Sequence, residues 1–270
     1  MCKILDLPHS SYYKWLNRKE TTVEKENYDI SRLILDYHDK FNNILGYRRM
    51  TLFINRLNQK SYNEKRIRRI MKMLGVSSKI RRKRKGYVKV KPQITAENIL
   101  NRKFSAERPN EKWLTDVTEF KIQGSDKKAY LSAIFDLYDK SIISYVISRF
   151  NDNKIVFDTF DLAVKSNPSA KPLFHSDRGY QYTSKIFHTK LTANEMMQSM
   201  SRVGRCIDNG PMEGFFGSLK AEMYYLNSFH NGKDLIKAIS DYIDFYNNQR
   251  FQENLKGMTP IEFRNHALAA

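Results

Sequence analysis

The sequence has little cysteine and no long apolar run, and each absence excludes a class of protein. Its 270 residues include two cysteines, Cys2 and Cys206, and no CxxC pair, which excludes a disulfide framework and disfavours a structural zinc site. No run of about 18 apolar residues is present, and the N-terminus lacks the charged-then-apolar pattern of a secretion signal. We therefore expect a folded intracellular protein with no membrane partner.

Negative charge is scarce in the first part of the chain. Residues 1 to 110 hold 27 Lys and Arg against 10 Asp and Glu, whereas residues 111 to 270 hold 20 against 19. Almost all of the net charge of +18 therefore belongs to the first part. This asymmetry is typical of a nucleic-acid-binding arm joined to a nearly neutral domain. The alternative is a basic surface that is only solvated.

Apolar residues recur at helical spacing throughout the basic part. Residues 1 to 20 predict one or two short helices. Three further helices are expected over residues 24–37, 47–58 and 63–74. Because the last of these is basic, they indicate a helix-turn-helix module over residues 21 to 78, with Arg66 and Arg69 contacting DNA. An ordinary helical bundle with a solvated basic face is the alternative.

A strongly basic tract follows this module. From residue 65 to residue 96 there are thirteen Lys and Arg and no Asp or Glu. The tract would repel itself unless phosphates neutralise it, and each phosphate contact releases a condensed counterion, so that affinity falls with salt. Such a tract positions DNA more readily than it reads bases. We expect a basic linker over residues 79 to 110, with DNA contacts at Arg81, Arg82, Lys83, Arg84 and Lys85.

The pattern changes near residue 111, where β-branched and aromatic residues become frequent. They predict strands over residues 112–120, 128–137 and 141–148, joined by short turns. A helix from about residue 151 to 165, a strand over 172–175, a helix over 184–191, a strand over 196–200 and a helix from Pro211 follow. This succession is that of an α/β RNase H-like fold, expected over residues 111 to 225. Residues 226 to 270 predict a helical extension with a capping box at Thr259.

Three acidic residues of this domain lie at positions from which their carboxylates could converge on a metal ion. Asp116 lies in an otherwise apolar strand, where a lone carboxylate is costly to bury. Asp177 follows the short strand, and Glu213 shares the flank of its helix with Lys220. Without a cation, three clustered carboxylates would repel one another. Oxygen ligands suit Mg²⁺, and two such ions about 3.5 to 4 Å apart activate the attacking oxygen and stabilise the leaving oxygen of phosphodiester exchange.

Other polar residues near these three have plainer interpretations. Asp136 and Asp139 fall at or beside a turn, where acids are common, and Glu119 points to the face of its strand opposite Asp116. For His175 we favour a hydrogen-bonded histidine at the end of a strand. The secondary candidates for orienting metal ligands or DNA are His175, Arg178, Tyr182 and Asn209.

The order of the three acids, with 35 residues between Asp177 and Glu213, resembles the D,D-35-E signature of retroviral-integrase-like DNA transposases. Residues 111 to 225 look like the catalytic core of bacterial insertion-sequence transposases of the IS-three family. The specific motifs are HSDRGYQY at residues 175–182, Asp208-Asn209 before Glu213, and Lys220 seven residues beyond it. GYRR at residues 46–49, YNNQR at 246–250 and GMTP at 257–260 are similar to further segments of that family.

The resemblance implies divalent-metal-dependent cleavage at the element's ends and transfer of the freed 3'-OH to another phosphodiester, usually through a circular intermediate. It implies that Asp116, Asp177 and Glu213 are catalytic and bind two Mg²⁺ ions, with Mn²⁺ as a substitute. Lys220 would contact DNA phosphate near the reacting end, and we also expect a DNA contact from Arg178. The implied partners are the terminal repeats, target DNA, other copies of the chain and the first-frame product of the same element.

Family members are often made as a frameshift fusion whose first part carries another helix-turn-helix and a coiled-coil segment. This chain has no heptad run, so it resembles the second part alone, a bacterial, cytoplasmic and nucleoid-associated protein. Two other functions stay open at this point: an RNase H-like nuclease that hydrolyses without strand transfer, and a catalytically inert DNA-binding regulator. The long basic arm favours a protein that holds extended duplex, and the intact set of three acids argues against an inert one.

Overall fold

The computed structural model describes residues 8–79, 96–202 and 206–269. The chain divides into two compact units, residues 1–80 and 81–270, and each is described by itself. The five predicted DNA contacts at residues 81–85 lie outside the described residues. No helix of the described ranges combines the length and the apolar character that crossing a membrane requires.

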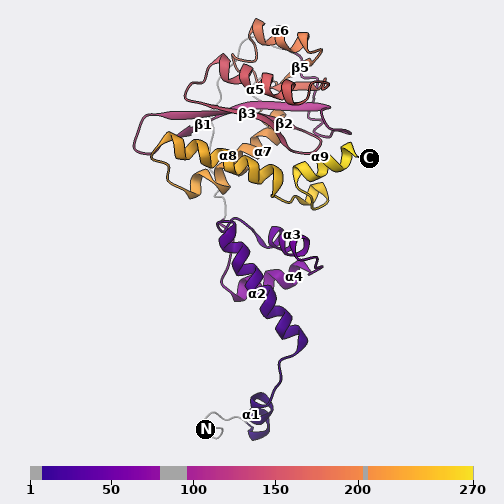
Figure 1. Cartoon of the computed structure of the whole chain (residues 1–270), viewed down its shortest axis with the longest axis vertical. Coiled ribbons are helices and arrows are strands. Elements are labelled where there is room, and N and C mark those ends of the chain that lie inside the picture. The colour runs from indigo at the N-terminus through magenta and orange to yellow at the C-terminus, as the bar shows by residue number, and fades with distance from the viewer. Residues whose placement is uncertain (1–7, 80–95, 203–205, 270) are drawn as a thin grey trace. The chain divides into compact units, whose positions relative to one another are not determined.

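The first unit contains the three expected helices, α2 (Thr22–Lys40), α3 (Tyr47–Leu57) and α4 (Glu64–Met73), together with a short α1 (His9–Leu16) (Figure 1). Helix α2 begins earlier than predicted because Thr21 and Glu24 form a capping box. The Asn63 side chain caps α4. The predicted apolar faces are buried and form the core of the unit at Ile30, Ile34, Met50, Phe53, Ile54, Ile67, Ile70 and Met71.

A five-stranded sheet organises the second unit. Strands β1 (Lys112–Lys121), β2 (Lys128–Asp136) and β3 (Ile142–Ser148) form the predicted antiparallel meander. Strands β4 (Leu173–Ser176) and β5 (Met197–Met200) run parallel to β1, so the strand order is β3-β2-β1-β4-β5. Parallel neighbours cannot be joined by a tight turn, and helices α5 and α6 accordingly precede β4 and β5. β1 is therefore a central strand with β4 as its neighbour.

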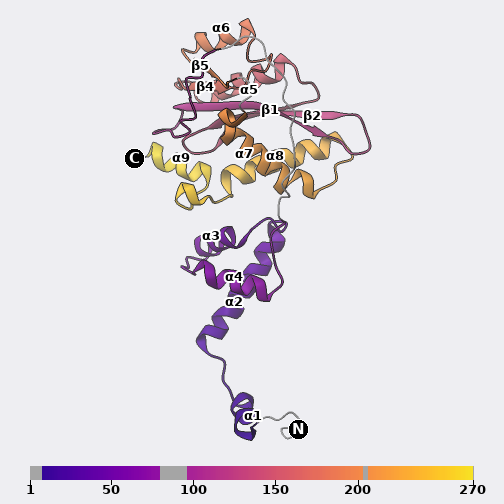
Figure 2. The ribbon, with the colours of Figure 1, turned by 180° about the vertical axis from the view of Figure 1, so that it is seen from behind.

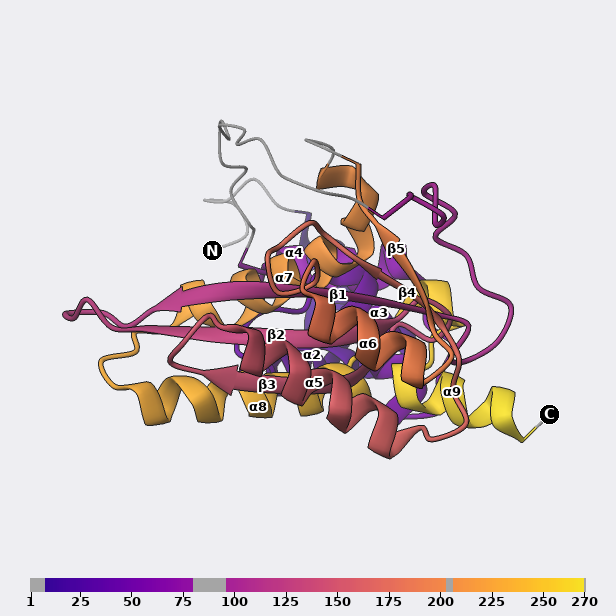
Figure 3. The same cartoon turned by 90° about the horizontal axis from the view of Figure 1, so that it is seen from above.

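Helices cover both faces of this sheet. Helices α5 (Asn153–Ser166) and α6 (Lys185–Ala193) cover one face, which Figure 3 shows from outside. Helices α7 (Gly210–Glu222) and α8 (Gly232–Asn248) cover the other (Figures 1 and 2). Leu219 of α7 and Ile239 of α8 belong to one buried cluster with Leu114 of β1, so the predicted C-terminal helix shares its core with the helix that carries Glu213. Shorter elements are η1 (Cys206–Asn209), η2 (Tyr224–Leu226), η3 (Glu253–Leu255) and α9 (Pro260–Leu268).

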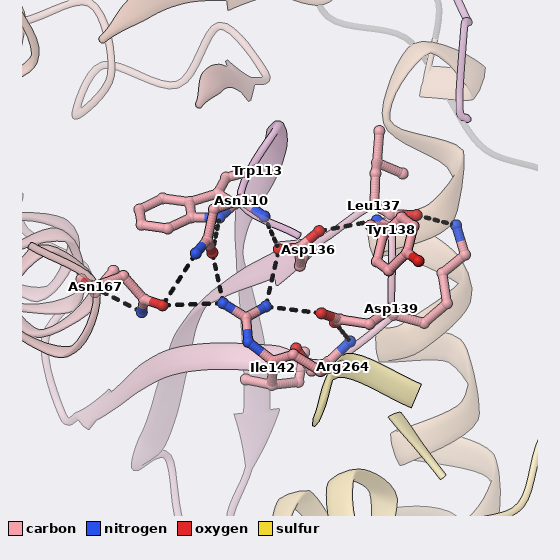
Figure 4. Close-up of polar contacts among 12 residues, drawn as sticks. Asn110, Trp113, Asp136, Leu137, Tyr138, Asp139, Ile142, Asn167 and Arg264 are labelled. Atoms are coloured by element: carbon pink, nitrogen blue, oxygen red, sulfur yellow. Dashed lines mark hydrogen bonds and ion pairs between the residues drawn. The ribbon is translucent and has the colours of Figure 1, made fainter. Parts of the chain in front are cut away.

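Helix α9 ties the C-terminal segment to the β2–β3 turn through a buried network (Figure 4). Arg264 donates Nη1 to Asp136 Oδ2 at 3.0 Å and to Asp139 Oδ2 at 2.7 Å. Its Nη2 donates to Asn110 Oδ1 at 2.6 Å and to Asn167 Oδ1 at 2.9 Å. Asp136 and Asp139 have no exposed surface, so the description of them as turn acids was incomplete: they are the buried partners of one arginine.

Candidate active site

The register of β1 and β4 brings two of the predicted catalytic acids to the same edge of the sheet. The strands are parallel, and Leu114 is the partner of His175. Asp116 and Asp177 each follow their paired residue by two positions. Asp177 follows directly after the end of β4, and because side chains alternate along a strand, Asp116 lies on the face of β1 that Leu114 occupies. That is the face covered by α7, which carries Glu213.

Asp116 sits in an environment that disfavours its charge. Its Oδ1 accepts a hydrogen bond from the Val117 backbone N–H at 2.8 Å. Burial raises the pKa of Asp116 to about 8, and the negative charges of Asp177 and Glu213 add to the rise. The charge of Lys220 acts in the opposite direction. Asp177 and Glu213 therefore both lie within electrostatic range of Asp116.

Asp177 is held by the turn that follows β4. Its Oδ1 accepts a hydrogen bond from the Gly179 backbone N–H at 2.8 Å, and burial raises the pKa of its carboxyl. A Cβ atom at position 179 would lie 3.0 Å from both Asp177 Oδ1 and Gln181 Oε1. Glycine at this position lets the backbone approach the carboxylate closely enough to donate that hydrogen bond.

Glu213 and Lys220 occupy the rim of α7 as predicted. Met212, Phe215, Phe216 and Leu219 form the buried stripe of this helix, whereas Glu213 lies in its first turn with an exposed side chain. Partial burial raises the pKa of Glu213. Lys220 donates from Nζ to Thr118 Oγ1 at 2.6 Å, which places its ammonium group over the strand that carries Asp116.

Asp177 and Glu213 each act electrostatically on Asp116, but the three acids do not form a complete set of metal ligands. Among the described residues, no three His, Cys, Asp or Glu side chains are gathered as a ligand group for an ion. Within the same ranges neither Asp116 nor Asp177 has an ion-pair partner. The donor set consists of carboxylate oxygens, the ligands that Mg²⁺ prefers. The donor chemistry fits a hard divalent cation, and ligation by these residues stays a prediction.

The secondary candidates form hydrogen bonds to residues around the predicted site. His175 is buried between Ser199 and Ser201, whose hydroxyl oxygens lie 2.9 Å from Nδ1 and 3.1 Å from Nε2. Burial lowers the pKa of His175 to about 4, so the ring is neutral at pH 7. This confirms the favoured interpretation of a hydrogen-bonded histidine. The Tyr182 hydroxyl lies 3.2 Å from Thr115 Oγ1 with the ring in the core.

Asn209 and Arg178 connect the segment before α7 to the two strands. Asn209 donates from Nδ2 to the Thr115 carbonyl oxygen at 3.1 Å, next to Asp116. Arg178, the residue after Asp177, donates from Nε to the Ser201 carbonyl oxygen at 2.6 Å. Both side chains therefore brace the site, and a direct role of Arg178 in DNA binding stays a prediction.

The two predicted contacts on α4 differ in their surroundings. The side chain of Arg69 is exposed. Arg66 instead forms an ion pair with Glu26 at 2.7 Å and donates from Nε to Asn27 Oδ1 at 2.9 Å. Its guanidinium group therefore holds α4 against α2. The exposed basic face of α4 consists of Lys65, Arg68, Arg69 and Lys72.

Sequence reasoning missed two clusters, the Arg264 network and a second one around Asp208. Asp208 has no exposed surface and lies between two arginines. Its Oδ1 is 2.7 Å from Arg102 Nε, and its Oδ2 is 2.9 Å from Arg202 Nε. Asp208 was noted only as part of a family motif. Arg102 lies more than a hundred residues away in sequence, and no local spacing pattern reports a contact at that range.

Known proteins match the chain in both units. Models described as integrase core domain match residues 106–206 and 213–268, and one described as HTH-like domain matches residues 25–84. A putative transposase for insertion sequence element IS150 from Escherichia coli is 39% identical over 266 residues, covering 98% of this chain and 92% of that protein. An uncharacterized transposase-like protein from Haemophilus influenzae is 40% identical over 206 residues, covering 76% of this chain and 94% of that one.

Among solved structures, a chain of the simian T-cell lymphotropic virus intasome aligns with a TM-score of 0.50 and 17% identity, covering 87% of this chain and 74% of that one. Together with the strand order, this confirms an RNase H-like integrase core domain preceded by a helix-turn-helix-like domain. Such a pairing defines a DNA-transposing class of protein. The chain belongs to the insertion-sequence transposases of the IS-three family.

Proposed function

We propose that the chain cleaves the ends of an insertion sequence and transfers the freed 3'-OH to another phosphodiester, in a reaction that requires a divalent metal. The usual course would join one end to the other in a circular intermediate before insertion. The observation that carries the proposal is the parallel pairing of β1, which carries Asp116, with β4, which Asp177 directly follows. Helix α7, which carries Glu213, packs against β1.

The electrostatics of these acids support a cation site. Their mutual repulsion and burial raise the pKa of Asp116 to about 8, so the site holds two full aspartate charges only when positive charge is added. Two Mg²⁺ ions, with Mn²⁺ as a substitute, would supply that charge, activate the attacking oxygen and stabilise the leaving oxygen. The residues that would hold them are Asp116, Asp177 and Glu213.

The remaining residues position these three and the DNA. Backbone N–H groups of Val117 and Gly179 each fix one aspartate oxygen, which leaves the second oxygen of each carboxylate to a metal ion. Lys220 lies over β1, where its ammonium group can contact a phosphate beside the reacting bond. Asn209 holds the start of α7 to β1 and so limits the movement of Glu213.

DNA would be held by the basic part of the chain. The exposed face of α4, with Arg69, and the tract with Arg81, Arg82, Lys83, Arg84 and Lys85 are the proposed backbone contacts. Two element ends must be brought together for strand transfer, so we propose that several copies assemble on the DNA. The first-frame product of the same element is a proposed additional partner, and the bacterial nucleoid is the proposed place of action.

The test is incubation of the purified chain with a labelled duplex that carries the terminal repeat of its own element, with and without Mg²⁺. We expect nicked and joined products with wild type in Mg²⁺, and neither product without the metal or with Asp116→Asn. Cleavage without joining would show a hydrolytic nuclease instead. Binding with no cleavage in either Mg²⁺ or Mn²⁺ would show an inert regulator and overturn the proposal.

A further inference from the structure

The cluster around Asp208 has an unusual charge balance. Asp208 accepts hydrogen bonds from Arg102 Nε at 2.7 Å, from Arg202 Nε and Nη2 at 2.9 Å each, and from Asn98 Nδ2 at 2.9 Å. The Arg202 backbone N–H also donates to it at 3.0 Å. These donors, Arg202 foremost, hold the pKa of Asp208 well below its usual range. One buried carboxylate is thus served by two guanidinium groups.

Other buried ion pairs in the same unit have no more than one arginine for each carboxylate. Arg250 pairs with one carboxylate, that of Glu222, at 3.0 Å. Arg264 pairs with two carboxylates at once, those of Asp136 and Asp139. One cation is enough to neutralise one buried anion. The Asp208 cluster therefore carries a surplus positive charge that its own burial does not require.

Exposure separates the arginines of this cluster from the others. The side chains of Arg102 and Arg202 are each 38% exposed, whereas Asp208 between them is 0% exposed. The side chains of Arg250 and Arg264 are 9% and 11% exposed. A guanidinium group has five N–H donors, and Asp208 takes one from Arg102 and two from Arg202. The donors that remain can reach a ligand in solution.

Hydrogen bonds connect residues next to the cluster with residues next to both predicted aspartates. Asn209, the residue after Asp208, donates to the Thr115 carbonyl oxygen beside Asp116. Arg202 follows Ser201, whose carbonyl oxygen accepts from Arg178 beside Asp177. The surplus positive charge therefore lies at the margin of the candidate active site.

We propose that Arg102 and Arg202 form a binding site for a DNA backbone phosphate beside the active site, with Asp208 holding both guanidinium groups in place. The inference rests on the proposed function, because it takes DNA as the substrate. Guanidinium groups bind phosphate through parallel N–H donors, which demands a fixed orientation. A buried carboxylate that already fixes two guanidinium groups lowers the entropic cost of ordering these side chains when phosphate binds.

The experiment measures the affinity of the full chain for duplex DNA at several salt concentrations in a chelating buffer, where no cleavage occurs. Arg102→Gln and Arg202→Gln are each expected to weaken binding several-fold and to lower the slope of log Kd against log salt by about 0.9. Arg250→Gln is the matched control, since it also removes one arginine from a buried carboxylate but lies too deep to touch DNA. It should leave the slope unchanged.

Two further variants separate DNA contact from loss of folding. Arg102→Lys and Arg202→Lys keep the charge and lose the fork of donors, so they should retain the salt slope and bind more weakly than wild type. Thermal unfolding of every variant is recorded beside the binding curves. The proposal is overturned if folded Arg102→Gln and Arg202→Gln proteins keep the wild-type slope, because the arginines then serve only Asp208.

Two duplexes identify the source of the phosphate, one carrying the element's terminal repeat and one of unrelated sequence. If the arginine variants bind only the terminal duplex more weakly, the site contacts the element end. If they bind only the unrelated duplex more weakly, the site contacts target DNA. Equally weaker binding to both duplexes means that the site contacts the backbone of either kind of DNA. Each of these supports the proposal. Wild type cleaving in Mg²⁺ while the arginine variants keep the slope would defeat this inference and leave the proposed function standing.

Discussion

Asp136 and Asp139 share a buried arginine, whereas Asp116 and Asp177 have no ion-pair partner in the described part of the chain. Each pair has one member in the sheet, Asp136 or Asp116, and one member just beyond the end of a strand. In both pairs, burial and the charge of the neighbouring aspartate raise a pKa: that of Asp136 to about 6 and that of Asp116 to about 8. The first pair has the permanent positive charge of Arg264 within ion-pair distance of both carboxylates. For the second pair, the charge of Lys220 acts against the rise in the pKa of Asp116, and Lys220 also donates a hydrogen bond to Thr118.

The contrast distinguishes a structural acidic pair from a candidate site. An arginine that belongs to the fold lets two carboxylates be buried at all times and links distant segments, as Arg264 links α9 to β2 (Figure 4). Carboxylates without such a partner disfavour their own ionisation until a cation arrives. We therefore assign stability to the Asp136–Asp139 pair and chemistry to the Asp116–Asp177 pair, and this assignment can be tested.

The largest expected effect is on catalysis. Asp116→Asn should lower cleavage and joining by at least about a thousandfold, because a bound metal supplies several kcal/mol of transition-state stabilisation. DNA affinity should stay close to that of wild type. Single-turnover assays on the terminal duplex measure the loss, and filter binding measures the affinity. A variant that still joins ends at near the wild-type rate would remove the chemical role from this pair.

The second effect is on stability. Arg264→Ala should lower the free energy of unfolding by about 3–5 kcal/mol, because it leaves two aspartates with no exposed surface uncompensated. Urea denaturation followed by circular dichroism gives the value. Asp116→Asn serves as the contrasting variant, since it changes a carboxyl group of the pair that has no arginine partner among the described residues. A loss below about 1 kcal/mol for Arg264→Ala would make the network dispensable and blur the distinction between the two pairs.

The Asp208 cluster gives a smaller, pH-dependent effect. Its arginines hold the pKa of Asp208 well below the usual range, so its contribution to stability is present above the unfolded-state pKa and fades as pH falls through the folded-state value. Asp208→Asn should lower the free energy of unfolding by about 2 kcal/mol at pH 7. Urea midpoints at pH 7 and pH 3 should show the difference shrinking. An equal loss at both values would mean that the carboxylate charge contributes nothing.

The smallest effect has the opposite sign. Because the folded-state pKa of Asp116 is raised to about 8, its contribution to stability decreases as pH rises from about 4, where the unfolded chain begins to ionise, to about 8. In a chelating buffer, Asp116→Asn should therefore stabilise the chain by at least about 1 kcal/mol at pH 8 and by little at pH 4. Melting curves at both values measure this. Destabilisation at pH 8 would contradict the account of an uncompensated charge.

Local patterns predicted most of the elements, including the strands and the helix on or beside which the three acids lie. The apolar stripe of α7 fixed which flank Glu213 and Lys220 occupy, because helical periodicity is a property of neighbouring residues. The alternation of β1 likewise fixed the face of Asp116. The strand register that sets Asp116 beside Asp177 was an expectation of the fold family, and only the structure supplies the pairing of Leu114 with His175.

Polar contacts between residues far apart in the sequence could not be predicted from sequence patterns. Asp136 and Asp139 looked like turn acids because their partner, Arg264, lies more than 120 residues further along the chain. Asp208 was noticed as a motif, yet its two arginines come from segments before β1 and after β5. A buried ion pair depends on three-dimensional proximity, which periodicity along one element does not encode. The early start of α2 was missed for a local reason, since the Thr21–Glu24 capping box was not considered.

The most direct test of the central claim is calorimetric titration of Mn²⁺ into the DNA-free chain at pH 8, comparing wild type with Asp116→Asn, Asp177→Asn and Asp136→Asn. We predict saturable binding by wild type and by Asp136→Asn, and loss of binding by Asp116→Asn and Asp177→Asn. Equal binding by all four proteins, or loss with Asp136→Asn alone, would contradict the assignment of the metal site to the unpaired aspartates.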